Sequence, residues 1–201
     1  LKINLTFNTA GTITLGAINF ATKTVTYITG TIVNTGSVLT VAAAGTTTFN
    51  TSGMTWGSLL TANNPTITLT TDMNLSGYLN EVGGHTMNGN NLYIGTSLII
   101  GGASSGTTVY ILNGTGTWSG ASYCMNSLTI NTTGTITISG TVTYRTGTLT
   151  YIAGTVVTTG STLSITVACT LNTNGIIWNN VTFSAVTVTL SSNLTLSGNF
   201  S

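Results

Sequence analysis

Threonine and aliphatic residues alternate along most of this chain. Residues 12–15 (TITL), 66–69 (TITL) and 135–138 (TITI) place apolar side chains on one side of an extended backbone and hydroxyl groups on the other. β-Branched residues favour strands. The charged helix formers are almost absent, because Lys and Arg together number three and Asp and Glu together number two. Gly, Asn and Ser separate the alternating segments and are typical of turns. The pattern predicts an all-β fold of short strands with almost no helix.

The chain also repeats itself at an interval of about 123 residues. Residues 5–15 (LTFNTAGTITL) match residues 128–138 (LTINTTGTITI), and residues 26–37 (TYITGTIVNTGS) match residues 150–161 (TYIAGTVVTTGS). Repetition at a fixed period is the mark of architectures that stack one structural unit on the next.

We therefore divide the 201 residues into a first repeat unit at 1–123 and a partial second unit at 124–201, which together form one continuous rod. Residues 80–127 are the less regular part of the first unit. The second unit stops where the first continues, so we expect the chain to be a window on a longer repetitive protein.

A weaker rhythm of about 15–20 residues lies inside the unit, with Gly-Thr or Pro-Thr starts at Gly11, Gly30, Gly45 and Pro65. Two folds compete to explain the two periods. The inner rhythm favours a β-solenoid, in which each step is one turn and the turns stack about 4.8 Å apart. The outer period would also suit a tandem array of immunoglobulin-like β-sandwiches. We favour the β-solenoid because stacked turns place like residues over like, and ladders of Thr, Ser and Asn do not repel one another.

Charge-poor segments of the GTITI and NLTLSG kind, at residues 134–138 and 193–198, resemble the β-helical repeats of bacteriophage tail fibres and tail spikes. They are equally similar to the β-helical passengers of large bacterial surface adhesins. The resemblance covers nearly the whole chain, is one of composition and period, and transfers no functional residues. It implies an extracellular, cell-surface or virion-surface rod. Together with the duplication and the near absence of titratable groups, this leads us to expect a non-enzymatic structural segment that projects, attaches or coats. A tail-spike-like protein that binds or cleaves glycans is the alternative.

The composition excludes several classes of function. Charged residues make up 2% of the chain, against roughly 25% in an ordinary domain, and the net charge is +1. No basic surface is present to bind nucleic acid. No apolar run approaches the ~18 residues that would insert in a membrane. We expect the partners to be further copies or neighbours in a larger surface assembly, with a cell-surface glycan as a further possibility.

The two acids are poor candidates for catalysis. Glycan cleavage needs a pair of carboxylates, and Asp72 aligns with Asn193 in the second copy, so the equivalent turn does without the acid. Glu81 and His85 flank Gly83-Gly84 and could meet across a turn, and we interpret them as parts of a polar loop. We therefore assign no catalytic residue. The single Asp argues against calcium, and the absence of a Cys/His cluster argues against zinc, so we assign no metal or cofactor.

Aromatic residues supply the remaining candidates for binding. Trp118, with Tyr110 and Tyr123 nearby, has no counterpart in the second copy, and we consider it the best platform for stacking on a sugar. Trp56 and Trp178 correspond across the repeat, which favours a structural role inside the rod or at a corner.

Two further features leave alternatives open. Cys124 and Cys169 are interpreted as small buried hydrophobic residues, with a disulfide as the alternative. The Thr-x-Thr runs resemble the ice-binding faces of solenoid antifreeze proteins, but a drift of the turn length from 15 to 20 residues would break a flat face. Ice binding is therefore the less favoured function.

Overall fold

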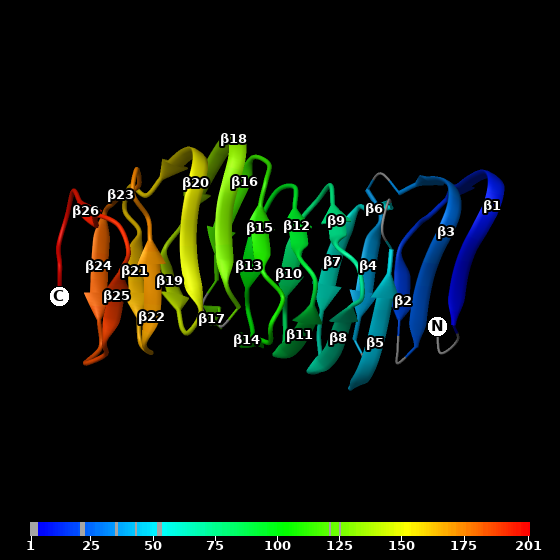
Figure 1. The fold of residues 1–201 in the computed structure, drawn as a ribbon, viewed down its shortest axis with the longest axis horizontal. Coiled ribbons are helices and arrows are strands. Elements are labelled where there is room, and N and C mark those ends of the chain that lie inside the picture. Colours follow the sequence, from blue (N-terminus) through cyan, green and yellow to red (C-terminus); the bar gives the residue numbers. More distant parts are fainter. Residues whose placement is uncertain are drawn as a thin grey trace.

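The chain is a single parallel β-solenoid of about nine turns in the computed structural model (Figure 1). Every strand pairing among the described residues is parallel, which confirms the solenoid and leaves no place for the antiparallel sheets of a β-sandwich. The part of the chain that the structure describes contains no helix. The described residues are 4–20, 23–34, 36–42, 44–51, 54–120, 122–124 and 126–201.

One turn takes about 20 residues and contributes three strands. Leu59 pairs with Leu79, and Leu79 pairs with Leu98, so successive partners are 20 and 19 positions apart. The turn is thus at the upper end of the expected 15–20 residues, because loops between strands complete it. The described residues of the less regular segment 80–127 also form short strands at this spacing.

The first sheet runs along one side of the rod and takes one strand from each turn. In order it contains β1 (Leu5–Thr14), β3 (Thr24–Val33), β5 (Gly45–Asn50), β8 (Pro65–Leu69), β11 (His85–Gly89), β14 (Ser104–Ser105), β17 (Tyr123–Cys124), β19 (Thr141–Tyr144), β21 (Thr162–Ile165) and β24 (Asn180–Phe183).

The second sheet has two arms, which cover the other two sides and are joined by the long strand β18 (Leu128–Ile138). One arm contains β2 (Ile18–Phe20), β4 (Val38–Val41), β7 (Ser58–Thr61), β10 (Leu79–Glu81), β13 (Leu98–Ile100) and β16 (Gly116–Ser119). The other arm contains β6 (Thr55–Trp56), β9 (Met73–Leu75), β12 (Leu92–Ile94), β15 (Tyr110–Leu112), β20 (Thr148–Val157), β22 (Cys169–Asn172) and β25 (Val188–Leu190). A separate pair, β23 (Ile177–Trp178) and β26 (Thr195–Leu196), lies near the C-terminus.

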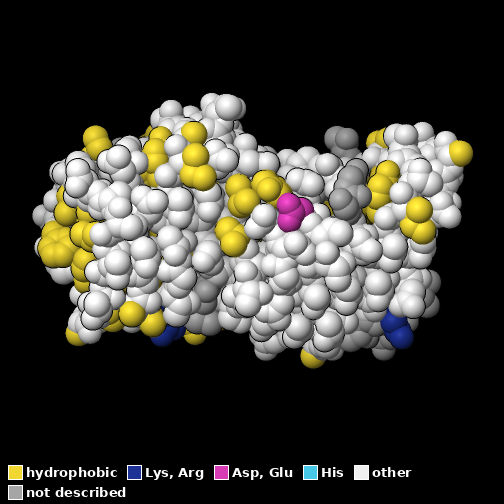
Figure 2. Space-filling view, in the orientation of Figure 1, with side chains coloured by type: hydrophobic (Ala, Val, Ile, Leu, Met, Phe, Trp, Pro, Cys, Tyr) yellow, Lys and Arg dark blue, Asp and Glu magenta, His cyan; other side chains and the backbone are white. Residues whose placement is uncertain are grey.

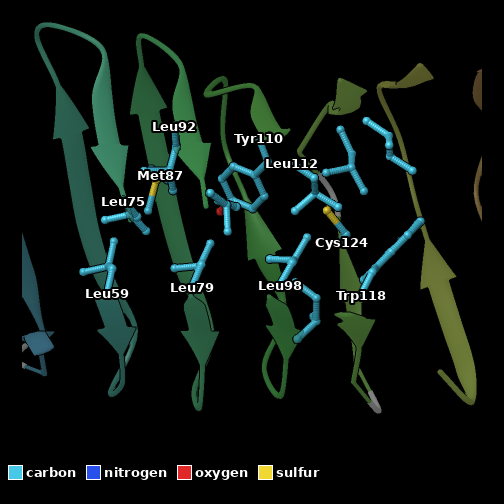
Figure 3. Close-up of a cluster of buried hydrophobic side chains, with 14 of the residues drawn as sticks. Leu59, Leu75, Leu79, Met87, Leu92, Leu98, Tyr110, Leu112, Trp118 and Cys124 are labelled. Atoms are coloured by element: carbon cyan, nitrogen blue, oxygen red, sulfur yellow. The ribbon is translucent and has the colours of Figure 1, made fainter. Parts of the chain in front are cut away.

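The core consists of columns of like side chains that run along the rod. Leu59, Leu79 and Leu98 are buried one above the other, as Figure 3 shows, and Trp118 continues their column. Alternation explains the columns, because every second residue of a strand points inward and parallel pairing in register stacks the inward residues. Cys124 and Cys169 belong to this core as free thiols, which confirms the interpretation as buried hydrophobic residues and rules out the disulfide.

Equivalent strands of the two repeat units have similar lengths but lie on different sheets. β5 belongs to the first sheet, whereas its counterpart β22 belongs to the second. β7 lies in the second sheet and its counterpart β24 in the first. The repeat of about 123 residues is a few residues longer than six turns of about 20. Each strand of the second copy therefore takes the next strand position within its turn.

Candidate functional site

A group of polar side chains interrupts the apolar core in the middle of the rod. Glu81 ends β10 and His85 begins β11, and the two residues are 0% and 4% exposed. The expectation of a polar loop is therefore wrong for both residues. Alternate residues of a strand face the same side, so the spacing of two could have shown this. Glu81 faces inward with Leu79, and His85 faces inward with Met87.

Three groups surround the imidazole of His85. Its Nε2 lies 3.4 Å from Glu81 Oε1 and 2.7 Å from the Tyr110 hydroxyl, and its Nδ1 lies 3.4 Å from Thr61 Oγ1. The rings of His85 and Tyr110 are stacked, with centroids 6.5 Å apart. Ser104 pairs with His85 in the next turn and also interacts with Glu81. The expected meeting of Glu81 and His85 thus occurs, but inside the rod.

Burial decides the charge state of this group. Removal from water raises the pKa of Glu81 well above its usual value, and the hydroxyls of Tyr110 and Ser104 offset only part of that rise. Burial also lowers the pKa of His85 to about 4. Burial therefore favours the uncharged form of both side chains, with the proton on Glu81 and none on the second nitrogen of His85. An uncharged pair avoids the large cost of placing ions in an apolar core.

A shallow hollow lies above His85 on the surface. Its volume is about 280 Å³, and it is lined by Asn64, Gly84, His85, Thr86, Ala103 and Ser105. Glu81 does not line the hollow. The buried groups lie close enough to share a proton, but no carboxylate lines the hollow.

Asp72, the other acid, lies in the turn between β8 and β9 and accepts a hydrogen bond from the backbone N–H of Asn91 at 3.0 Å. It therefore ties one turn to the next. Asp72 and Glu81 do not face each other across a surface, because the carboxyl of Glu81 is enclosed. Among the described residues no three His, Cys, Asp or Glu side chains gather to hold a metal ion.

The sugar-stacking platform is wrong for two of its three residues. Trp118 and Tyr110 are 1% and 0% exposed, so neither ring offers a face to a sugar. Trp118 points inward because it continues the column of Leu98, and it packs edge-on against Tyr144. Tyr123 is half-buried, and the Arg145 guanidinium lies 4.2 Å above its ring.

Trp56 and Trp178 are both buried in the core, the position expected from their correspondence across the repeat. Trp56 makes edge-to-face contacts with Phe7 and Phe49, at centroid distances of 6.2 and 6.3 Å. Such contacts fill the width of the rod and stabilise neighbouring turns.

Threonine ladders form the most regular outward feature of the first sheet. Thr46, Thr66 and Thr86 pair in register on β5, β8 and β11, and Thr48 and Thr68 form a second ladder beside them. Neither pairing contains a bulge, so the variation in turn length does not disturb these strands. Figure 2 shows the surface over β5, β8 and β11 as largely free of hydrophobic and charged side chains. The argument from drifting turn length therefore does not apply here.

Comparisons with protein-family models, curated proteins and solved structures give no match for this chain. Within the described part of the chain, no helix has the length and apolar character needed to cross a membrane. Inferences about function therefore rest on the geometry above.

Proposed function

We propose that this chain is a non-enzymatic structural segment of an extracellular or virion-surface fibre. The observation that supports this most is the set of buried columns, such as Leu59, Leu79 and Leu98, that pass from turn to turn. Each inner turn is hydrogen-bonded to the turns on both sides. About nine turns at roughly 4.8 Å give a stiff rod of roughly 45 Å, suited to projecting or coating.

The surface chemistry agrees with a place in a larger assembly. Charged residues form 2% of the chain, and the outward positions of the strands are mainly Thr, Ser and Asn. A nearly uncharged surface packs against identical neighbours without repulsion, whereas free proteins usually rely on net charge to stay apart. Neighbouring copies are therefore the expected partners.

The location is tested by labelling intact source cells or particles with an antibody against this chain, with protease shaving as a second readout. We expect gold label on thin filaments before lysis and loss of the signal after shaving. Label that appears only after lysis would contradict the proposal. A cytoplasmic protein of the same source controls for leakage.

Glycan binding or cleavage is the alternative, and the burial of Trp118 and Tyr110 removes its best platform. We expect no binding on a glycan array and no degradation of polysaccharide. Binding that is lost in Tyr123→Ala would favour the glycan-binding alternative. Turnover that Asp72→Asn abolishes would contradict a non-enzymatic role.

Ice binding is a second candidate, favoured by the two bulge-free ladders on β5, β8 and β11. Alternate residues of a strand are about 6.7 Å apart and turns about 4.8 Å apart, which makes a flat, regular array of methyl and hydroxyl groups. Thermal hysteresis measures this function. An ice binder would lose hysteresis in Thr66→Lys and keep it in the matched Thr40→Lys on another side of the rod. No hysteresis in the unmodified chain would exclude it.

A further inference from the structure

Asparagine followed directly by glycine occurs three times in this chain, at Asn88, Asn113 and Asn174. In such a pair the backbone nitrogen of the glycine can attack the side-chain amide carbon of the asparagine, because glycine has no side chain to obstruct the approach. The attack needs a free glycine N–H and an asparagine side chain that can turn toward it. The structure gives the three pairs very different freedom to meet these conditions.

Asn88-Gly89 is held by hydrogen bonds on both of its reacting groups. The side-chain carbonyl oxygen of Asn88 accepts a hydrogen bond from the Thr107 N–H at 3.3 Å, and the Gly89 N–H donates to the Thr107 hydroxyl at 3.1 Å. Both residues belong to β11 and pair with β8 in the preceding turn. Ring closure at Asn88 therefore requires local opening of the stacked turns.

Asn113-Gly114 lies in the connection between β15 and β16 and is held through its backbone. Asn113 is exposed, but its N–H donates to the carbonyl oxygen of Ile94 at 3.1 Å. The Thr132 hydroxyl donates to the carbonyl oxygen of Gly114 at 2.8 Å. Gly114 also packs so closely on the next turn that an added Cβ would overlap the carbonyl oxygen of Gly95. The backbone of this pair therefore has little room to rotate.

Asn174-Gly175 is the least restrained pair. The two residues form the centre of an exposed turn between β22 and β23, closed by a hydrogen bond of 3.0 Å from the Ile176 N–H to the Thr173 carbonyl oxygen. Gly175 has φ +99°, which fits the third position of such a turn. The Asn174 N–H donates to the Ser192 hydroxyl at 3.0 Å, a group that the reaction does not use. Among the described residues, neither the Asn174 side chain nor the Gly175 N–H has a hydrogen-bond partner.

We propose that Asn174 is a site of spontaneous deamidation in the folded rod, whereas hydrogen bonds protect Asn88. The Gly175 nitrogen loses its proton to solvent and forms a bond to the side-chain carbonyl carbon of Asn174. The amide nitrogen takes up a proton and leaves as ammonia, which gives a cyclic succinimide. Water then adds to either carbonyl of the ring, and the ring opens to aspartate or isoaspartate. The reaction needs no enzyme, oxidant or cofactor.

The modification is a large change for a chain of this composition. One added carboxylate lowers the net charge from +1 to zero. Isoaspartate also lengthens the main chain by one methylene, directly before the buried residues Ile176 and Trp178. The first repeat unit has no amide at the equivalent position, because Asn174 aligns with Ser52. The proposed site therefore belongs to the second unit alone.

Peptide mass spectrometry after incubation of the intact chain at mildly alkaline pH tests the assignment. Incubation in H₂¹⁸O marks the product, because water adds its oxygen when the succinimide opens, and digestion with pepsin at acidic pH stops further reaction. We expect Asn174 to react fastest, Asn113 more slowly, and Asn88 at least about tenfold more slowly than Asn174, since its reaction needs local opening. Asn174→Ser copies the first unit and should abolish the main product.

Two controls separate the effect of the fold from that of the sequence. In urea the three pairs share the same following residue, so we expect similar rates at all of them. Thr107→Val removes the acceptor of the Gly89 N–H and should raise the rate at Asn88 while leaving that at Asn174 unchanged. Circular dichroism checks that the variant keeps its strands.

Equal rates at Asn88 and Asn174 in the folded chain would overturn the proposal. So would an Asn174 that reacts in urea but not in the folded chain, because the turn would then be too rigid for ring closure. A rate at Asn88 that Thr107→Val leaves unchanged would contradict the protection by hydrogen bonds.

Discussion

His85 Nε2 lies 3.4 Å from Glu81 Oε1 inside the rod, where neither side chain is more than 4% exposed. Glu81 has its pKa raised by burial and His85 has its pKa lowered to about 4, so the folded pair holds one proton. Unfolding returns the two groups to their model values of 4.5 and 6.5. The unfolded pair therefore also holds one proton between pH 4.5 and 6.5.

This proton count predicts a stability that is nearly constant from pH 4.5 to 6.5 and falls above it. Above pH 6.5 the unfolded chain loses the His85 proton while folded Glu81 keeps its own, so the free energy of unfolding decreases by up to about 1.4 kcal/mol per pH unit. The loss continues until the pH exceeds the raised pKa of folded Glu81. Urea unfolding at a series of pH values measures it.

Glu81→Gln reverses this dependence. With only His85 titrating, the folded state stays neutral while the unfolded state gains a proton below pH 6.5. Stability should then fall as the pH decreases from 6.5 to about 4. A variant that keeps the alkaline loss of the unmodified chain would show that another group causes it.

The leucine column predicts a large cost for a cavity in mid-rod. Leu79→Ala removes a fully buried side chain between Leu59 and Leu98 and should lower the free energy of unfolding by about 2–5 kcal/mol. Leu60→Ala, one residue after Leu59 on the outward side, is the control and should cost less than about 1 kcal/mol. Equal effects would mean that the inward and outward sides are assigned wrongly.

Two glycines separate the effect of backbone conformation from that of a close approach. Gly140 has φ +69° with nothing within 4 Å of an added Cβ, so Gly140→Ala should cost only about 1 kcal/mol. Gly106 has φ +123°, and an added Cβ would press on the backbone of Met87 in the neighbouring turn. Gly106→Ala should therefore lower the melting temperature clearly more. A smaller effect at Gly106 would mean that these turns are less closely stacked.

The cysteines predict an order of reactivity. Burial raises the pKa of Cys124 to about 12 and that of Cys169 to about 11, and Cys169 is the more exposed, at 7% against 0%. Because the thiolate is the reactive form, iodoacetamide at pH 8 should label Cys169 slowly and leave Cys124 unlabelled until the chain unfolds. Peptide mass spectrometry follows both sites. Faster labelling of Cys124 would contradict its place in the core.

Alternation predicted the strands and the stacked turns because a period of two fixes which side chains face inward in any strand. It also holds for Glu81, which lies two residues after Leu79 on β10 and therefore faces inward with it. The expectation of a loop followed instead from the usual preference of carboxylates for exposed positions. Trp118 was misjudged for a different reason, since its lack of a counterpart in the second copy says nothing about its direction. Its place over Leu98 depends on the register of β13 and β16, which pairs residues 20 positions apart. The three strands per turn likewise depend on where the chain bends.

Methyl NOE spectroscopy on leucine-labelled, deuterated protein tests the solenoid most directly. The stacked register predicts strong cross-peaks between Leu59 and Leu79 and between Leu79 and Leu98, which are one turn apart, and a much weaker one between Leu59 and Leu98. Absence of both strong cross-peaks, with contacts between residues of adjacent antiparallel strands instead, would contradict the β-solenoid and the rod proposed from it.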